Sequence, residues 1–306
     1  MKQGTIGFDD KYKFGLEIEF ANEEQDLNQI YSELVSEKLP IKFLNNHALH
    51  VSKLLDYKSW YLDIDASVTI NSKERLFGGE LSSKIMTDNQ KDWKEVENIC
   101  KVLKETKSYP GSYCSEHITV DIKEQLQDKK FIETLYKVIT LFETDISLFY
   151  MGDKYEDRKT AKKYASKMSI NLLKNIRTID FNKDSIENII NKSNSFKTKN
   201  GINLAKRNQG LIEIRYPNAT LNIETILNNV KFTLSLIEAI SENKFDIKYL
   251  DYLIEELETD GTFLLRYFYN FEDEELFNYL INTISKTKTD KKDFIKQYTK
   301  VIQTKK

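Results

Sequence analysis

The segment Phe14–Phe20 reads Phe-Gly-Leu-Glu-Ile-Glu-Phe, so apolar residues alternate with glycine or glutamate. A two-residue period is the pattern of a β-strand with one buried face. The apolar residues would face a core, and Glu17 and Glu19 would lie side by side on the opposite face. The segment therefore predicts a sheet that carries two neighbouring carboxylates on one of its faces.

Polar residues recur on three later segments that also have strand patterns. Glu80 lies near the start of an apolar run, and His117 opens an alternating segment. Glu213 and Arg215 share one face of a third strand. Carboxylates at positions i and i+2 repel each other unless a positive group lies between them. Mg²⁺ would supply that charge, because it favours carboxylates, water and phosphates.

Each of these residues, taken alone, also fits an ordinary structural role. Glu17 and Glu19 fit the solvated outer face of a half-buried strand. Glu213 and Arg215 fit an ion pair on one strand face, and His117 fits a histidine whose ring nitrogens are satisfied by hydrogen bonds. The residues by themselves leave these alternatives open.

Long apolar patterns with helical spacing separate the predicted strands. Only three prolines and ten glycines occur among the 306 residues, which favours long elements. We therefore predict an α+β fold with a mostly antiparallel sheet and flanking helices. We expect two parts: residues 1–243 hold the strands, and residues 244–306 form a helical C-terminal extension packed on them. Helices are predicted over residues 27–39, 93–104, 131–150 and 223–240, and from residue 249 onward.

The composition is that of a globular protein, with 40% hydrophobic and 31% charged residues. The formal net charge of −2 gives no basic field, so we expect no nucleic-acid partner and no binding to an anionic membrane. No apolar run reaches the ~20 residues of a membrane span. Met1–Asp10 has no apolar core of a signal peptide, so a cytoplasmic location is expected, with Cys100 and Cys114 as reduced thiols.

The order of the acid-bearing segments resembles the amidoligase family, a branch of the glutamine synthetase and glutamate–cysteine ligase superfamily. The resemblance covers roughly residues 12–240. Each motif alone is weak, and six motifs in the family's order are fairly specific. The matching motifs are Gly15–Phe20, Trp60 with Asp65-Ala66-Ser67, Glu80–Ser82, Ser115–Thr119, Arg158 with Tyr164-Ala165, and Gly210–Arg215 with Asn218–Leu221.

The resemblance implies a curved, mostly antiparallel sheet like the glutamine synthetase catalytic domain, which cradles ATP and Mg²⁺ or Mn²⁺. The implied metal shell comprises Glu17, Glu19, Glu80, His117 and Glu213. The implied catalytic residues are Arg215, Glu213 and Arg158. The nucleotide contacts that we predict are His117, Arg215, Thr119 and Lys206. For Lys206, which precedes the last of these strands, a solvated loop position is the alternative.

The chemistry that the resemblance implies suits these residue types. ATP would phosphorylate a carboxylate, and an amine would attack the acyl-phosphate to form an amide or isopeptide bond. Arginine can bind a phosphate or carboxylate with two parallel hydrogen bonds. The expected substrate is an amino acid, a peptide or a polyamine. The family members' usual second histidine is Thr119 here, their usual glycine before the first histidine is Ser115, and Ala66 replaces another glycine.

Two other functions stay open at this point. A catalytically inactive relative would keep the fold and act as a nucleotide- or peptide-binding module, and Thr119 in place of histidine favours it. An interaction protein would bind a partner through the aromatic and leucine-rich segment Tyr249–Phe277, although core packing explains the same residues more simply. The sequence does not indicate an oligomeric state.

Overall fold

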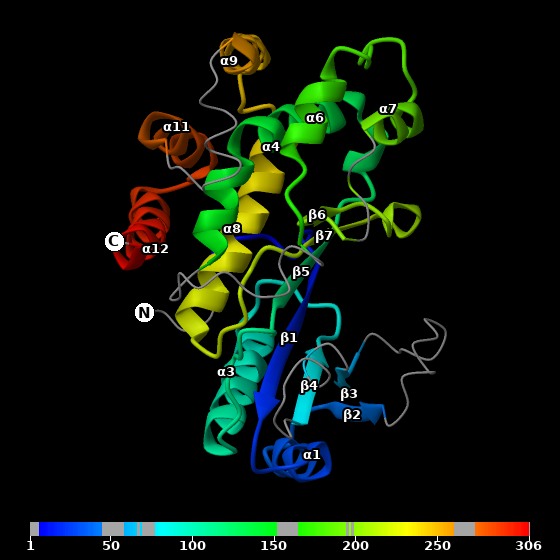
Figure 1. The fold of residues 1–306 in the computed structure, drawn as a ribbon. Coiled ribbons are helices and arrows are strands. Elements are labelled where there is room, and N and C mark those ends of the chain that lie inside the picture. Colours follow the sequence, from blue (N-terminus) through cyan, green and yellow to red (C-terminus); the bar gives the residue numbers. More distant parts are fainter. Residues whose placement is uncertain are drawn as a thin grey trace. The chain divides into compact units, whose positions relative to one another are not determined.

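A computed structural model gives the structure of the chain (Figure 1). It describes residues 6–44, 58–65, 68, 77–151, 165–193, 196, 199–259 and 273–305. The chain divides into two compact units. Among the described residues, unit 1 takes those up to Asp121 and those from Pro217 to Val230, and unit 2 takes the rest.

Unit 1 is built on strands that pair in the order β2-β3-β4-β1-β5. Neighbouring strands run antiparallel, except that β2 and β3 are parallel. The longest strand, β1, lies between β4 and β5, so its side chains face neighbours on both sides. The strands are β1 (Phe14–Asn22), β2 (Ile41–Leu44), β3 (Trp60–Ile64), β4 (Phe77–Ser82) and β5 (Glu116–Asp121).

Two helices, α1 (Leu27–Ser36) and α3 (Gln90–Glu105), pack with the apolar side chains of this sheet. Helix α1 begins at a capping box, in which the Asp26 side chain accepts hydrogen bonds from the first turn. The ring of Phe14 on β1 lies 5.6 Å from that of Trp93 on α3. The apolar half of the β1 alternation is therefore the part that forms the core of unit 1.

Unit 2 is mostly helical and is organised around the buried helix α4 (Lys129–Tyr150). The C-terminal helices bind this helix through polar contacts: Lys137 pairs with Asp251 at 2.7 Å, and the Tyr298 hydroxyl donates to Asp145 at 2.9 Å. The remaining elements are η2 (Gln125–Gln127), α6 (Ser169–Ile176), α7 (Ile186–Ser193), the antiparallel pair β6 (Ile202–Asn203) and β7 (Leu211–Ile214), η3 (Arg207–Gln209), α9 (Ile247–Thr259), α11 (Glu274–Ile284) and α12 (Lys288–Lys305).

Helix α8 (Ile223–Ser241) contributes residues to both units, since the unit boundary falls after Val230. In unit 2, its Phe232 ring stacks on Phe149 of α4 with centroids 4.1 Å apart. The predicted division of the chain at residue 243 stays a prediction.

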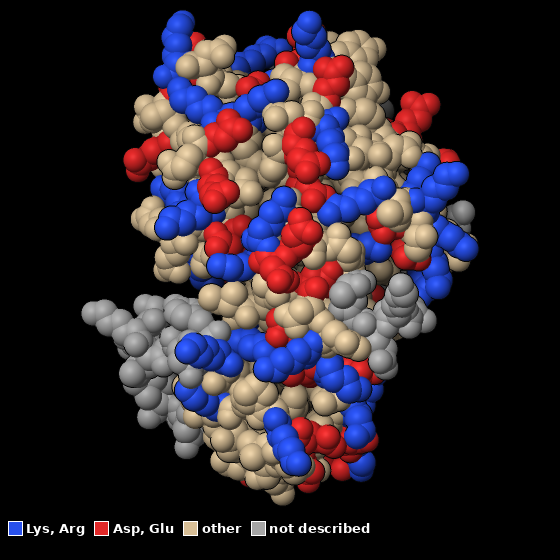
Figure 2. Space-filling view, turned by 180° about the vertical axis from the view of Figure 1, so that it is seen from behind, with Lys and Arg blue, Asp and Glu red and all other residues tan. Residues whose placement is uncertain are grey.

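The predicted α+β class and the mostly antiparallel strands are confirmed. The predicted strands near residues 14, 80, 117 and 211 are present, and so are the four long helices. Apolar alternation did not indicate strand β2, which has only four residues. Helical spacing likewise did not indicate the eight-residue helices α6 and α7. None of the described helices is long and apolar enough to cross a membrane. Lys and Arg are interspersed with Asp and Glu on the surface in Figure 2.

Close approach of β4 to its neighbours requires a glycine at position 79. A Cβ atom there would lie 2.7 Å from the Phe20 ring and 2.9 Å from Leu27 Cδ2. Both side chains are buried and have little room to shift. We expect Gly79→Ala to lower the free energy of unfolding by about 1–3 kcal/mol, measured by urea denaturation.

Gly15→Ala is the matched control on β1, because a Cβ there would meet only Ser83 Oγ at an ordinary 3.6 Å. Equal stabilities of the Gly79→Ala and Gly15→Ala proteins would contradict the packing described for β4.

Candidate functional site

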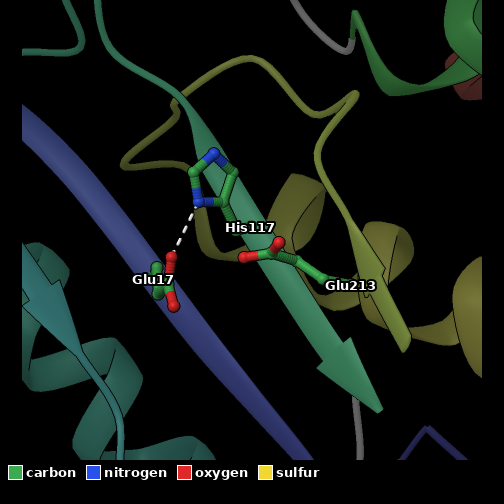
Figure 3. Close-up of side chains that lie close together, drawn as sticks. All are labelled: Glu17, His117 and Glu213. Carbon is green, nitrogen blue, oxygen red and sulfur yellow. Dashed lines mark hydrogen bonds and ion pairs between the residues drawn. The ribbon is translucent and has the colours of Figure 1, made fainter. Parts of the chain in front are cut away.

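The polar face of β1 carries Glu17 and Glu19, as the alternation predicts. Glu17 lies directly opposite His117 on β5. A hydrogen bond of 2.7 Å joins His117 Nδ1 to Glu17 Oε2 (Figure 3). The His117 side chain is 5% exposed and that of Glu17 is 24% exposed, so the bond is largely shielded from water.

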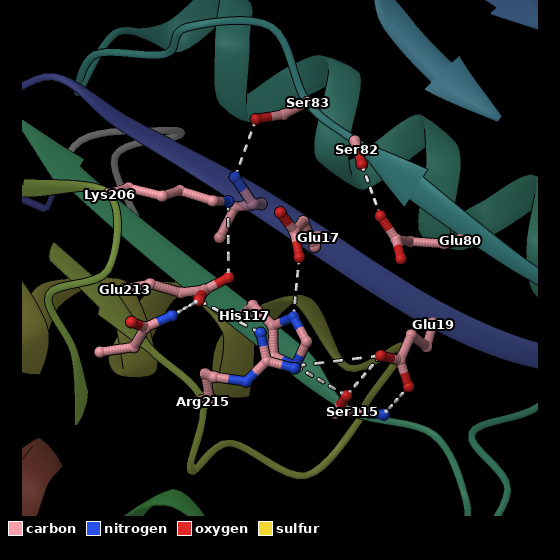
Figure 4. Close-up of polar contacts among 12 residues, drawn as sticks. Glu17, Glu19, Glu80, Ser82, Ser83, Ser115, His117, Lys206, Glu213 and Arg215 are labelled. Atoms are coloured by element: carbon pink, nitrogen blue, oxygen red, sulfur yellow. Dashed lines mark hydrogen bonds and ion pairs between the residues drawn. The ribbon is translucent and has the colours of Figure 1, made fainter. Parts of the chain in front are cut away.

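Ser115, just before β5, extends this contact to the second glutamate. Its backbone N–H and its hydroxyl each donate to a different oxygen of Glu19, both at 2.6 Å. Ser115 Oγ also lies 3.0 Å from His117 Nε2. A continuous hydrogen-bonded chain therefore runs from Glu17 through His117 and Ser115 to Glu19 (Figure 4).

The proton inventory of this chain constrains His117. A serine hydroxyl has one proton, and an ionised Glu19 takes it. His117 Nε2 must then donate its own N–H to Ser115 Oγ, while Nδ1 is engaged by Glu17. Both imidazole nitrogens are thus occupied, and His117 can ligate a metal only by releasing one of these partners.

A second group of carboxylates lies where β1 pairs with β4, across β1 from the strand β5 that carries His117. Glu19 is opposite Glu80 on β4, and Glu80 is opposite Asp63 on β3. Glu19, Asp65 and Glu80 each place a carboxylate oxygen within 4.8 Å of the others. Like charges on facing strand positions destabilise a sheet. Three hard oxygen donors at this spacing fit Mg²⁺ or Mn²⁺.

The electrostatics of Glu80 reflect this crowding. Burial raises the pKa of Glu80 well above its usual range, and the nearby carboxylates of Glu17, Glu19 and Asp65 raise this pKa further. A hydrogen bond of 2.7 Å from the Ser82 hydroxyl opposes the shift. A cation bound beside Glu80 would offset the carboxylate repulsion that adds to the effect of burial on this pKa.

Unit 2 holds the third polar group, centred on the buried carboxylate of Glu213 on β7. Asn203 Nδ2 donates to Glu213 Oε2 at 2.6 Å, from the position directly opposite on β6. Arg215 Nη1 lies 3.1 Å from the same oxygen, and Lys206 Nζ lies 3.8 Å from Oε1 (Figure 4). Two cations and an amide thus surround one buried carboxylate.

The remaining predicted residues are placed as follows. Thr119 lies on β5 opposite Gly15, on the same face as His117. Arg158 lies outside the described residues, as do Ala66, Ser67 and Tyr164 of the sequence motifs.

Sequence reasoning missed three members of these groups. Asp65 was noted only as part of a turn motif, although its carboxylate lies with those of Glu19 and Glu80. Ser115 was noted only as a replacement for glycine. Asn203 lies directly opposite Glu213 in the antiparallel pairing of β6 with β7, and that register is the signal that could have indicated it.

The chain matches the model of a known protein family. The family model described as "Putative amidoligase enzyme" matches residues 10–237. No curated protein matches the chain. The matched range includes every residue of the three polar groups.

The raised pKa of Glu80 predicts a pH dependence of stability. The folded protein retains this proton at pH values where the unfolded chain has lost it, so the free energy of unfolding falls as the pH rises above the ordinary glutamate value of 4.5. We expect Glu80→Gln to make this fall shallower, because the buried Glu116 and Glu143, whose pKa values are also raised, still contribute to it. Urea denaturation of both proteins with a metal chelator, from pH 4.5 upward, measures it.

Glu24→Gln is the control, because Glu24 is an exposed carboxylate paired with Lys107. It should keep the wild-type pH dependence. If the free energy of unfolding changes with pH in the same way in the wild-type and Glu80→Gln proteins, the folded state does not raise the pKa of Glu80.

Proposed function

The chain belongs to the amidoligase family, and from this premise we propose that it is an ATP- and Mg²⁺-dependent ligase that joins a carboxylate to an amine through an acyl-phosphate intermediate. The observation that carries the proposal is the group formed by Glu19, Asp65 and Glu80, whose oxygens lie within 4.8 Å of one another. Such a group costs stability unless it has a cationic ligand.

Glu19, Asp65 and Glu80 would hold Mg²⁺ or Mn²⁺, which when bound offsets negative charge on ATP phosphates and on an incoming carboxylate. We keep Glu17, His117 and Glu213 as proposed members of the metal shell. The hydrogen bonds of Ser115 to both oxygens of Glu19 hold that carboxylate in one orientation before a ligand arrives. Such preorganisation lowers the cost of binding.

Arg215 would contact the transferred phosphate, since its guanidinium can donate two parallel hydrogen bonds. The guanidinium is held in place by Glu213, whose Oε2 lies 3.1 Å from Arg215 Nη1. Lys206, 43% exposed and near the same carboxylate, is a second proposed phosphate contact. Arg158 is proposed to contact nucleotide or a substrate carboxylate. His117 and Thr119 complete the proposed nucleotide contacts.

The reaction needs positioning and charge stabilisation more than a nucleophile from the protein. ATP gives its γ-phosphoryl group to the substrate carboxylate and leaves as ADP. The amine nitrogen then attacks the acyl carbon, phosphate leaves, and the amine loses a proton. A curved sheet like that of glutamine synthetase, a cytoplasmic location and an amino acid, peptide or polyamine substrate are parts of the proposal.

Two carboxylate variants test the binding of nucleotide and metal. We expect Glu19→Gln and Glu213→Gln each to weaken Mg·ATP binding by about 10–100-fold, the usual scale for loss of a group that supports a metal site. Isothermal titration calorimetry measures the affinity, and circular dichroism checks the fold. Glu24→Gln should bind like the wild type. Unchanged affinity in both site variants would refute the proposed metal shell.

Turnover separates an enzyme from a binding module. A ligase releases ADP and phosphate from Mg·ATP only when a carboxylate and an amine are both present. We expect pools of amino acids, peptides and polyamines to contain a pair that stimulates this release in the wild type, and Arg215→Lys to reduce the rate by at least about tenfold. Tight Mg·ATP binding with no stimulation by any pool would favour an inactive relative.

A further inference from the structure

Glu143 is a completely buried carboxylate in the middle of α4 that none of the roles above uses. It accepts hydrogen bonds from the backbone N–H of Met168 at 2.8 Å and of Ser169 at 2.7 Å. The Tyr216 hydroxyl donates a third hydrogen bond to it. Burial raises the pKa of Glu143, and the bonds from Ser169 and Tyr216 oppose that rise. All of these residues belong to unit 2.

The ring of Tyr216 is held by packing, in addition to the hydrogen bond of its hydroxyl. A Cβ atom on Gly201 would lie 1.9 Å from the ring, so the ring packs directly on the glycine backbone. The Tyr150 ring stacks nearby, with centroids 6.5 Å apart and an interplanar angle of 19°. The Tyr216 ring is therefore confined on the side of Gly201, and its hydroxyl is bound to Glu143.

Tyr216 immediately follows Arg215, which carries the proposed phosphate contact. The backbone N–H of Arg215 donates to the Gly201 carbonyl at 2.7 Å. The main chain at Arg215 is thus held by Gly201, and the next residue is held by Glu143. A long arginine side chain can reach a fixed point only when the backbone that carries it is fixed.

We propose that Glu143 is a positioning residue for Arg215, which acts through Tyr216 to set where the guanidinium meets the phosphate. The proposal rests on the proposed ligase function. Glu143 touches neither nucleotide nor metal, and its effect passes along the chain Glu143–Tyr216–Arg215.

A purely structural role is the alternative, because Glu143 also binds the start of α6. Another tyrosine distinguishes the two roles. Tyr136 lies on α4, as Glu143 does, and its buried hydroxyl donates a hydrogen bond to the Leu172 carbonyl of α6 at 2.7 Å. Tyr136→Phe and Tyr216→Phe each remove one buried hydroxyl that supports unit 2, and Tyr216 alone is adjacent to Arg215 in the chain.

The test compares these two variants by Mg·ATP calorimetry in the 306-residue chain. We expect Tyr216→Phe to weaken binding by about 3–10-fold, and Tyr136→Phe to leave it within about twofold of the wild type. In an Arg215→Ala background, Tyr216→Phe should weaken binding no further. Glu143→Gln, which keeps the side-chain size, should resemble Tyr216→Phe. Equal effects of the two tyrosine variants, or the same loss with and without Arg215, would overturn the proposal.

A measurement without nucleotide separates failure of this proposal from failure of the ligase function. Amide hydrogen exchange at Arg215 reports opening of its bond to Gly201. We expect faster exchange there in Tyr216→Phe than in Tyr136→Phe, after correction for global stability. A wild-type protein that does not bind Mg·ATP refutes the ligase function, and unchanged Arg215 exchange in Tyr216→Phe refutes the tie between Glu143 and Arg215.

Discussion

Repulsion between carboxylates on one sheet face is the constraint on which the described arrangement depends. Glu19 and Glu80 face each other across β1 and β4, and Asp65 lies with them. A sheet that only had to be stable would place opposite charges or apolar residues there. A cation and a phosphorylated ligand would complete the charge balance at these facing positions, which is the role that we propose for them in this member of the amidoligase family.

Different partners offset each carboxylate in the protein itself. Glu17 binds His117, Glu19 binds both donors of Ser115, and Ser82 donates to Glu80. In unit 2, Glu213 has Arg215 and Asn203. These bonds hold the side chains in fixed orientations, so that little ordering remains when a ligand binds. They also mean that a ligand must exchange partners with the protein, most clearly at His117, where both ring nitrogens are engaged.

The period of two along Phe14–Phe20 was enough to predict β1 and the shared face of Glu17 and Glu19, because strand geometry fixes it. The contacts of Asp65 and Ser115 depend on strand register and on loop placement, which no local pattern records. The role of Glu143 could not be predicted for a different reason. It is one of several acids in the long apolar helix α4, and its partners Met168 and Tyr216 are distant in sequence. Local periodicity therefore predicts elements and faces, and not the partners of single buried polar groups.

We propose that the sheet face of β1 and β4 binds a divalent cation through Glu19, Asp65 and Glu80. A crystal structure with Mn²⁺ and a non-hydrolysable ATP analogue tests it most directly, because anomalous scattering locates Mn²⁺ independently of the protein. We expect an anomalous peak about 2.0–2.3 Å from carboxylate oxygens of these residues, the usual range for such an ion. A peak elsewhere, or nucleotide bound with no peak at this face, would contradict it.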